Sequence, residues 1–332
     1  MNLVGHLLHT AISVTAAGLL LLIDCQCCCT AMKALLILGF ISLMGAKGLE
    51  DFPQSYVVAK RDSSHAVTLP CGTTTKNDVT WTFEGQDVEF NGRISMDGPN
   101  LLVKYVGKPM LGKYTCLSEG QTASTFLLME AEEEEELDSL LSCRARSYYC
   151  TFNCIWHQRK YRAVRLGLGP NCHDGGNQCS WFNGTTKSQN ERIHFDLTHS
   201  LNPFAEEISR LELTVEAIKD YTFLQRTKTF YLRDIIQPDS PQIVRCQKGS
   251  SGINVTIQPP SSWPKPHSFF RLEHQIEYER KDDGELHSLL VSSSTILIPL
   301  KITKLRVRSR DPLVRSAWSE WTDSTCSTKL TH

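Results

Sequence analysis

Near its C-terminus the chain reads Trp318-Ser319-Glu320-Trp321-Thr322. Tryptophans three residues apart share a face of a polyproline II segment, which has three residues per turn. Just upstream, Arg306, Arg308 and Arg310 occupy alternate positions after the apolar Leu305, so in a strand their guanidinium groups share one face. We therefore expect the arginines and indoles to interleave as a cation–π ladder, in which each layer contributes about 0.5–1 kcal/mol at an exposed site.

The alternative is a surface turn with two ordinary tryptophans, but both halves of the ladder are present at matching spacing. The stretch resembles the Trp-Ser-x-Trp-Ser box of the cytokine-receptor homology module, with Thr322 in place of the last serine. The expected structural box consists of Arg306, Arg308, Arg310, Trp318, Ser319, Trp321 and Thr322.

Composition and patterning predict an all-β protein of two or three domains. The chain has 332 residues and a net charge of −1, which gives no nucleic-acid-binding footprint. Short runs of alternating apolar residues, punctuated by Gly, Pro and Asn, indicate strands throughout residues 49–332.

Residues 49–130 are expected to form an immunoglobulin-like domain. Cys71, Trp81, Tyr114 and Cys116 resemble the disulfide, the packed tryptophan and the tyrosine corner of that sandwich. The resemblance implies a Cys71–Cys116 disulfide, which contributes roughly 2–4 kcal/mol. The pattern indicates a fold and says nearly nothing about function.

The glutamate-rich residues 131–138 are expected to be a solvated linker. Two further domains follow, over residues 139–237 and 238–332, with a proline-stiffened joint between them. In the first of these, Cys143 and Cys154 would staple a hairpin, an arrangement that resembles the N-terminal half of the cytokine-receptor module. In the second, Cys246 and Cys326 are candidates to pair.

Residues 1–48 are interpreted as an upstream extension followed by a signal peptide that starts at Met32. The apolar run 34–44 is too short to span a bilayer, and Ala46 and Gly48 fit a signal peptidase site. A single uncleaved anchor is the alternative, which Lys33 and the cysteine run argue against. No later run is long and apolar, so we expect a secreted, extracellular chain without stable membrane insertion.

Removal of the leader leaves nine cysteines, so at least one is free or bonded to another chain. Of Cys150, Cys172 and Cys179, two are expected to pair and one to be available for an interchain bond. Sequons at Asn183 and Asn254 agree with export.

Enzyme chemistry finds little support. Cys172-His173 with Cys179 lacks the Cys-x2-Cys pairs of structural zinc sites, and no hydrolase, metalloprotease or phosphate-loop motif occurs. We expect no catalytic residue, no metal and no cofactor.

Residues 221–238, 262–270 and 316–321 closely resemble the receptor-like beta subunits of interleukin-12-type cytokines. The resemblance is specific in the last two domains and generic in the first, and the sequence indicates a diverged, non-mammalian form. It implies an immunoglobulin-like domain followed by two fibronectin type III domains. It also implies capture of a four-helix-bundle alpha subunit and engagement of cell-surface class I cytokine receptors.

The resemblance places the alpha-subunit contact at the elbow of the last two domains. There Asp311 would receive an arginine of the partner, while Phe269 and Leu313 replace tyrosines of the family. Because Phe269 and Phe270 are adjacent, only one can be free unless the segment is a loop. The implied contact residues are Tyr148, Glu206, Phe269, Phe270, Asp311 and Leu313.

The resemblance also marks two departures and one modification. The family's interchain cysteine aligns with Asn202, so that bridge cannot form there, and Ile298 occupies a family half-cystine position. Trp318 would carry C-mannose. The same architecture also fits a soluble alpha-type receptor for another helical cytokine, and an adhesion-type immunoglobulin protein is the alternative from a different class.

Overall fold

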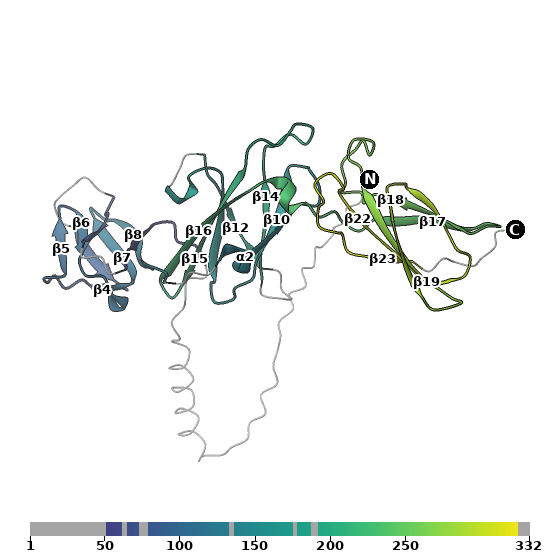
Figure 1. Ribbon diagram of the computed structural model, residues 1–332. Coiled ribbons are helices and arrows are strands. Elements are labelled where there is room, and N and C mark those ends of the chain that lie inside the picture. Colours follow the sequence, from purple (N-terminus) through teal and green to yellow (C-terminus); the bar gives the residue numbers. More distant parts are fainter. Residues whose placement is uncertain are drawn as a thin grey trace, which may run out of the picture. The chain divides into compact units, whose positions relative to one another are not determined.

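The computed structural model describes residues 51–61, 65–72, 79–132, 136–174, 178–186 and 192–324. In these ranges almost every regular element is a β-strand, which confirms the all-β prediction (Figure 1). The expected extension and signal peptide, over residues 1–48, lie outside the described residues. No helix in the described ranges is long and apolar enough to cross a membrane.

The first part of the chain forms two facing groups of strands around a buried cluster that contains Trp81, Tyr114 and Leu127. The Cys71–Cys116 disulfide lies in the same cluster, and the Tyr114 hydroxyl donates to the Met110 carbonyl at 2.9 Å, as in a tyrosine corner. The elements are β1 (Tyr56–Ala59), β2 (Val67–Leu69), β3 (Thr80–Phe83), β4 (Gln86–Asp87), β5 (Ile94–Asp97), β6 (Asn100–Val103), the 3-10 turn Lys108–Met110, β7 (Gly112–Ser118) and β8 (Gln121–Glu130).

The middle part packs the sheet β13-β14-β10-β9 against strands β12, β11, β15 and β16. Strands β9 and β10 pair with Cys143 opposite Cys154, and the two are bonded. The elements are α2 (Leu137–Leu140), β9 (Leu141–Arg144), β10 (Thr151–Trp156), β11 (Ala163–Leu168), the 3-10 turn Cys172–Asp174, β12 (Ser180–Asn183), β13 (Thr185–Thr186), β14 (Ile193–Thr198), β15 (Leu211–Lys219), β16 (Thr222–Phe230) and the 3-10 turn Leu232–Ile235.

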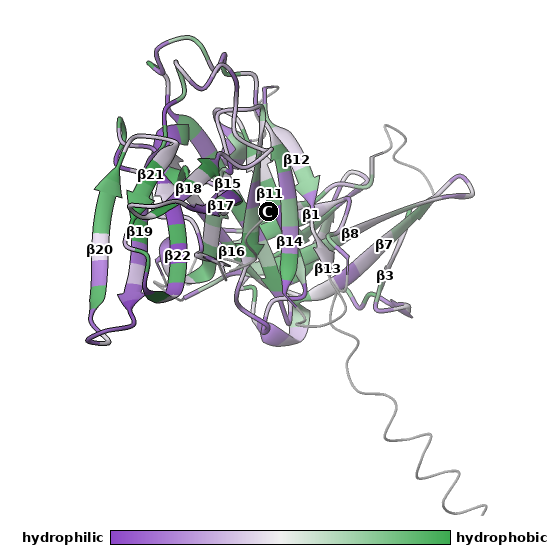
Figure 2. Cartoon of the chain, turned by 90° about the vertical axis from the view of Figure 1, so that its right-hand side faces the viewer, coloured by the Kyte–Doolittle hydropathy of each residue, from purple (hydrophilic) through white to green (hydrophobic). Residues whose placement is uncertain are grey.

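The last part has a three-stranded sheet, β17-β18-β21, and a four-stranded sheet, β20-β19-β22-β23, around a third core with Val255, Ile276 and Val307 at its centre. Polar and apolar residues alternate along these strands, as expected where one face is buried (Figure 2). The strands are β17 (Gln242–Lys248), β18 (Ile253–Gln258), β19 (Glu273–Arg280), β20 (Leu286–Val291), β21 (Thr295–Ile298), β22 (Ile302–Arg310) and β23 (Thr322–Ser324).

A continuous sheet joins the first and middle parts. Strand β8 pairs with β7 on one side and, over Met129 and Glu130, runs parallel to β16 on the other. The expected acidic linker therefore connects two parts of the chain that backbone hydrogen bonds between β8 and β16 already join. Two of its described residues form ion pairs at the surface: Glu132 pairs with Arg61, and Asp138, in the single turn α2, pairs with Lys228. The domain boundaries themselves stay a prediction.

Arg165 lies at the centre of this joint. Its guanidinium carbon is 4.1 Å from the centroid of the Phe52 ring and 4.0 Å from that of Trp181. Its Nη2 is 2.7 Å from the carboxylate of Glu216, whose side chain is only 3% exposed. The Tyr56 hydroxyl donates to the same carboxylate at 2.9 Å. The N-terminal segment is thus fastened to the middle part through Tyr56 and Phe52, which contact an ion pair formed within the middle part.

The joint between the middle and last parts is also fixed by hydrogen bonds. The Arg144 guanidinium donates to the carbonyls of Gln237 and Pro238 and to the Asp239 carboxylate, at 2.8 to 3.0 Å. Gln237 in turn donates to the Trp318 carbonyl at 2.9 Å. The proline-containing joint and the Trp-Ser-Glu-Trp-Thr stretch therefore hold each other in place.

Loss of Arg165 should loosen the first joint. Arg165→Met leaves Glu216 buried without its cation, a change that typically costs about 3–5 kcal/mol. Hydrogen exchange of the β1 and β8 amides in the secreted protein should accelerate accordingly. Adding Glu216→Met should recover most of the protection, while Arg192→Met, at an exposed site, should change nothing. Unchanged exchange in Arg165→Met would show that the ion pair does not hold this joint.

Candidate functional site

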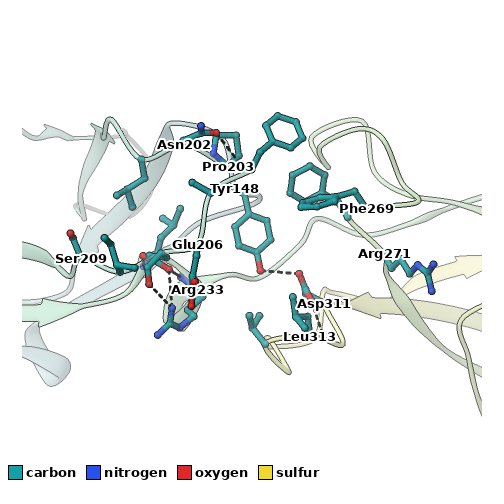
Figure 3. A pocket seen from close by; sticks show the side chains of 18 of the residues that line it. Tyr148, Asn202, Pro203, Glu206, Ser209, Arg233, Phe269, Arg271, Asp311 and Leu313 are labelled. Atoms are coloured by element: carbon teal, nitrogen blue, oxygen red, sulfur yellow. Dashed lines mark hydrogen bonds and ion pairs between the residues drawn. The ribbon is translucent and has the colours of Figure 1, made fainter.

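The structure contains an apolar pocket of about 930 Å³, the elbow groove, between the middle and last parts (Figure 3). Its walls come from segments far apart in sequence, because the joint brings the loop before β15 next to the loops that precede β19 and follow β22. The lining residues are Tyr148, residues 200–209, Leu232, Arg233, residues 269–271 and residues 311–314.

Asp311 forms the polar floor of this groove. It follows the last residue of β22 and is only 4% exposed. One carboxylate oxygen accepts a hydrogen bond from the Tyr148 hydroxyl at 2.9 Å, and the other accepts from the Leu313 amide at 2.8 Å. The backbone amide of Asp311 donates to Ser316 Oγ at 3.0 Å. The loop after β22 is thus shaped around the carboxylate.

Tyr148 reaches this carboxylate from the middle part of the chain. Burial, and then the negative charge and hydrogen bond of Asp311, raise the pKa of the Tyr148 hydroxyl far above its ordinary value. The phenol therefore stays protonated and remains a hydrogen-bond donor. Its ring packs against Phe270 at 5.8 Å and against the buried Trp263 at 6.0 Å, centroid to centroid.

Three phenylalanines form one wall of the groove. Phe270 is buried, and its ring centroid lies 4.8 Å from that of Phe269 and 5.3 Å from that of Phe204. The segment that carries Phe269 and Phe270 is a turn and not a strand, so the two rings are not forced to opposite faces. Phe269 remains 62% exposed while Phe270 anchors the wall.

The rim of the groove is unusually apolar for a protein surface. Leu313 is 89% exposed and Ile208 is 81% exposed, and the exposed rings of Phe204 and Phe269 continue the same surface. Apolar side chains that gather in a concave site are typical of a protein–protein contact or a ligand groove.

The charged residues of the rim have different tasks. Glu207 accepts hydrogen bonds from the amides of Leu232 and Arg233, so it fixes the 3-10 turn after β16. The neighbouring Glu206 is exposed, and none of the described residues forms a hydrogen bond or ion pair with its side chain. Glu206 is therefore an exposed acidic group on the rim of the groove.

All six residues implied as partner contacts line this one groove. Sequence reasoning missed Phe204, Ile208, Glu207, Arg233 and Arg271. The segment 200–209 contains no regular strand, so no periodic pattern marks its inward side chains. The Asn202 side chain accepts a hydrogen bond from the Phe204 amide at 3.0 Å. This local turn directs the Phe204 ring toward the groove.

The Trp-Ser-Glu-Trp-Thr stretch forms a ladder with β22. Trp321 lies 4.4 Å from both Arg306 and Arg308, and Trp318 lies 4.9 Å from Arg308 and 4.5 Å from Arg310, from guanidinium carbon to ring centroid. On their other side, Arg306 and Arg310 form ion pairs with glutamates of β19.

The hydroxyl side chains of the box fasten it to the rest of the chain. Ser319 Oγ accepts from the Ser309 amide at 2.9 Å, and Thr322 Oγ1 donates to the Pro241 carbonyl at 2.5 Å. The box thus buttresses the loop that carries Asp311. C-mannosylation of Trp318 stays a prediction.

The cysteines resolve a question that the sequence left open. Cys172 bonds to Cys179, and Cys150 is exposed and unbonded. Cys246 is disulfide-bonded, but Cys326 lies outside the described residues, so their pairing stays a prediction. Of the three candidates for an interchain bond, only Cys150 has a free thiol.

A group that could hold a metal ion occurs once in the described ranges, and none of its residues lines the groove. Asp283 and Glu285 in the β19–β20 turn and His287 on β20 place one ligand atom each within 4.8 Å of the others. Asp283 already pairs with Arg280. The elbow groove contains no comparable group among the residues described.

Comparison with known proteins agrees with the resemblance read from the sequence. The family described as "Cytokine interleukin-12p40 C-terminus" matches residues 138–219. The chain is 28% identical over 288 residues to interleukin-12 subunit beta of Sigmodon hispidus, and 28% identical over 290 residues to that of Felis catus. Each match covers 79% of this chain and 86% of the relative. The chain is thus similar to interleukin-12 subunit beta over most of its length, at low sequence identity.

Proposed function

We propose that this chain is the secreted, receptor-like subunit of a heterodimeric cytokine of the interleukin-12/interleukin-23 type. In this proposal the elbow groove binds a four-helix-bundle alpha subunit, and the pair engages cell-surface class I cytokine receptors to signal in immunity. The observation that carries the proposal is the groove itself, which gathers six separately implied contact residues around one buried carboxylate.

The dimensions and chemistry of the groove suit a helix. An α-helix with its side chains is about 10–12 Å across, and amphipathic helices dock by laying an apolar stripe into an apolar groove. Phe204, Phe269 and Phe270 supply rigid aromatic area, and Ile208 and Leu313 supply flexible apolar contacts at the rim. Clustered aromatic anchors of this kind dominate the binding energy of many interfaces.

Asp311 supplies specificity within this apolar surface. Each carboxylate oxygen already accepts one hydrogen bond, which leaves a lone pair on each for a partner cation. A guanidinium can use both in a charge-assisted pair, and burial makes that pair sensitive to the loss of either member. The partner helix should therefore carry an arginine or lysine flanked by apolar residues.

A soluble alpha-type receptor for another helical cytokine remains the nearest alternative, because it would use the same elbow. The two functions differ in when the complex forms. A cytokine subunit is secreted already bound to its helical partner, whereas a soluble receptor meets its ligand outside the cell. Co-expression with candidate helical subunits distinguishes them. An adhesion protein would bind no helical subunit, either during secretion or outside the cell.

Removal of the Asp311 charge should abolish capture of the partner. Asp311→Asn keeps the side-chain shape and an acceptor oxygen for the Leu313 amide, and its NH2 group can donate to the Tyr148 hydroxyl oxygen, so the chain should still fold and be secreted. Because the partner cation would be left buried and unpaired, binding should weaken by about 2–5 kcal/mol. The measurement is co-purification of a co-expressed helical subunit, followed by its dissociation constant.

Asp323→Asn is the matched control, because it removes the same charge from an exposed position on β23. It should leave binding unchanged. Equal binding by wild type and Asp311→Asn would refute the assignment of this carboxylate to the contact.

Cys150 is proposed as the covalent link to the partner. The Cys150 carbonyl accepts a hydrogen bond from the His199 amide at 2.8 Å, and Ser200, which follows His199, lines the groove. Tyr148, two residues earlier, lines it too. The thiol is therefore close to the proposed partner, whereas Asn202 offers none.

Cys150→Ser should convert a disulfide-linked heterodimer into one that separates on a non-reducing gel. Non-covalent co-purification should persist, because the groove is unchanged. Peptide mapping without reduction should identify the Cys150 peptide joined to a partner peptide in the wild type. A wild-type complex in which Cys150 is a free thiol would contradict the proposal.

A further inference from the structure

The outer face of the sheet β17-β18-β21 carries the asparagine of an N-glycosylation sequon, Asn254, next to an exposed leucine, Leu297. Along β18, Ile253, Val255 and Ile257 are buried in the third core, while Asn254, between the first two, is exposed. No described residue hydrogen-bonds the Asn254 side chain. The asparagine therefore stands free in the middle strand of the sheet, pointing to solvent.

Leu297 lies directly across from Asn254 on the neighbouring strand β21. Its side chain is 58% exposed, although Ile296 and Ile298 beside it point inward. Side chains that face each other across an antiparallel pair have Cβ atoms about 4.5–5.5 Å apart. Any group attached to Asn254 therefore begins next to Leu297.

Strand β21 is also an edge of its sheet among the described residues, since it pairs with β18 alone. An edge strand with an exposed apolar side chain is a template for pairing with another chain, and soluble proteins usually cover or charge such edges. No charged residue of β21 does so, because its sequence is Thr-Ile-Leu-Ile. The edge needs some other cover.

We propose that an N-linked glycan on Asn254 provides this cover, lying over Leu297 and closing the β21 edge to self-association. Asn254-Val255-Thr256 is an acceptor sequon, and Thr256, two residues on in a strand, shares the outer face with Asn254. The sequon is thus built so that a bulky, solvated group is tolerated by the folded sheet. Three disulfides in the described residues agree with the oxidising compartment in which such transfer occurs.

The group transfer needs a co-substrate, a polyprenyl-diphosphate-linked oligosaccharide. The Asn254 side-chain nitrogen forms a bond to C1 of the first sugar and loses one proton. The bond from C1 to the diphosphate oxygen breaks, and the polyprenyl diphosphate leaves with that electron pair. No oxidant or reductant is involved.

The second sequon offers a matched comparison. Asn183 is also exposed, but it lies at the end of β12 opposite Arg165 of β11, with no exposed apolar residue across from it. A glycan at Asn183 would add mass and solubility without covering an apolar edge. The two sites should therefore respond differently to removal.

The test uses the full chain secreted by eukaryotic cells. Peptide mass spectrometry reports occupancy at Asn254, and sedimentation over a range of concentrations reports self-association. Asn254→Gln should raise the self-association constant at least about tenfold, which corresponds to about 1.4 kcal/mol. Adding Leu297→Ser should restore the wild-type value, and Asn183→Gln should leave it unchanged.

Trimming the glycan of the folded wild-type protein to its first sugar keeps the test independent of folding. Trimming should raise self-association in wild type and have no effect in Leu297→Ser. An unmodified Asn254 would overturn the proposal. So would self-association that is unchanged after trimming and in Asn254→Gln, or a rise that Leu297→Ser does not reverse, because another surface would then be responsible.

Discussion

A hydrogen bond from the hydroxyl of the half-buried Tyr148 to the buried Asp311 carboxylate joins the two walls of the elbow groove. Tyr148 belongs to the middle part of the chain and Asp311 to the last, so this contact exists only when the joint is correctly set. Hydrogen bonds from Arg144 to the Gln237 carbonyl and from Gln237 to the Trp318 carbonyl fix that joint. The groove, its aromatic wall and its acidic floor all depend on this arrangement.

The cation–π ladder acts on the groove from a distance. It places the box against β22, and the short loop between them has to close over Asp311, where Ser316 bonds its amide. The tryptophans do not line the groove. Their role is structural, and the binding chemistry lies in the loop they support. The first part of the chain is held in a similar way, because Tyr56 and Phe52 contact the Arg165–Glu216 ion pair of the middle part.

How much of this could be predicted depended on the kind of signal. The ladder followed from the sequence because strand and polyproline periods fix which side chains share a face. The six contact residues came from resemblance. Phe204 and Ile208 escaped because an irregular loop has no period. The parallel pairing of β8 with β16 could not be predicted because it joins segments that are distant in sequence. Cys150, Cys172 and Cys179 allowed three pairings, and only the structure identifies Cys172–Cys179 as the bonded pair.

The most direct measurement is hydrogen exchange of the secreted chain, alone and in complex with a co-expressed four-helix-bundle subunit. If the elbow groove holds the partner, amides in residues 200–209, 268–271 and 311–314 should become protected on binding. The amides of the outer sheet β17-β18-β21 should exchange as before. Protection confined to that sheet or to the first part of the chain, with the groove unchanged, would contradict this assignment.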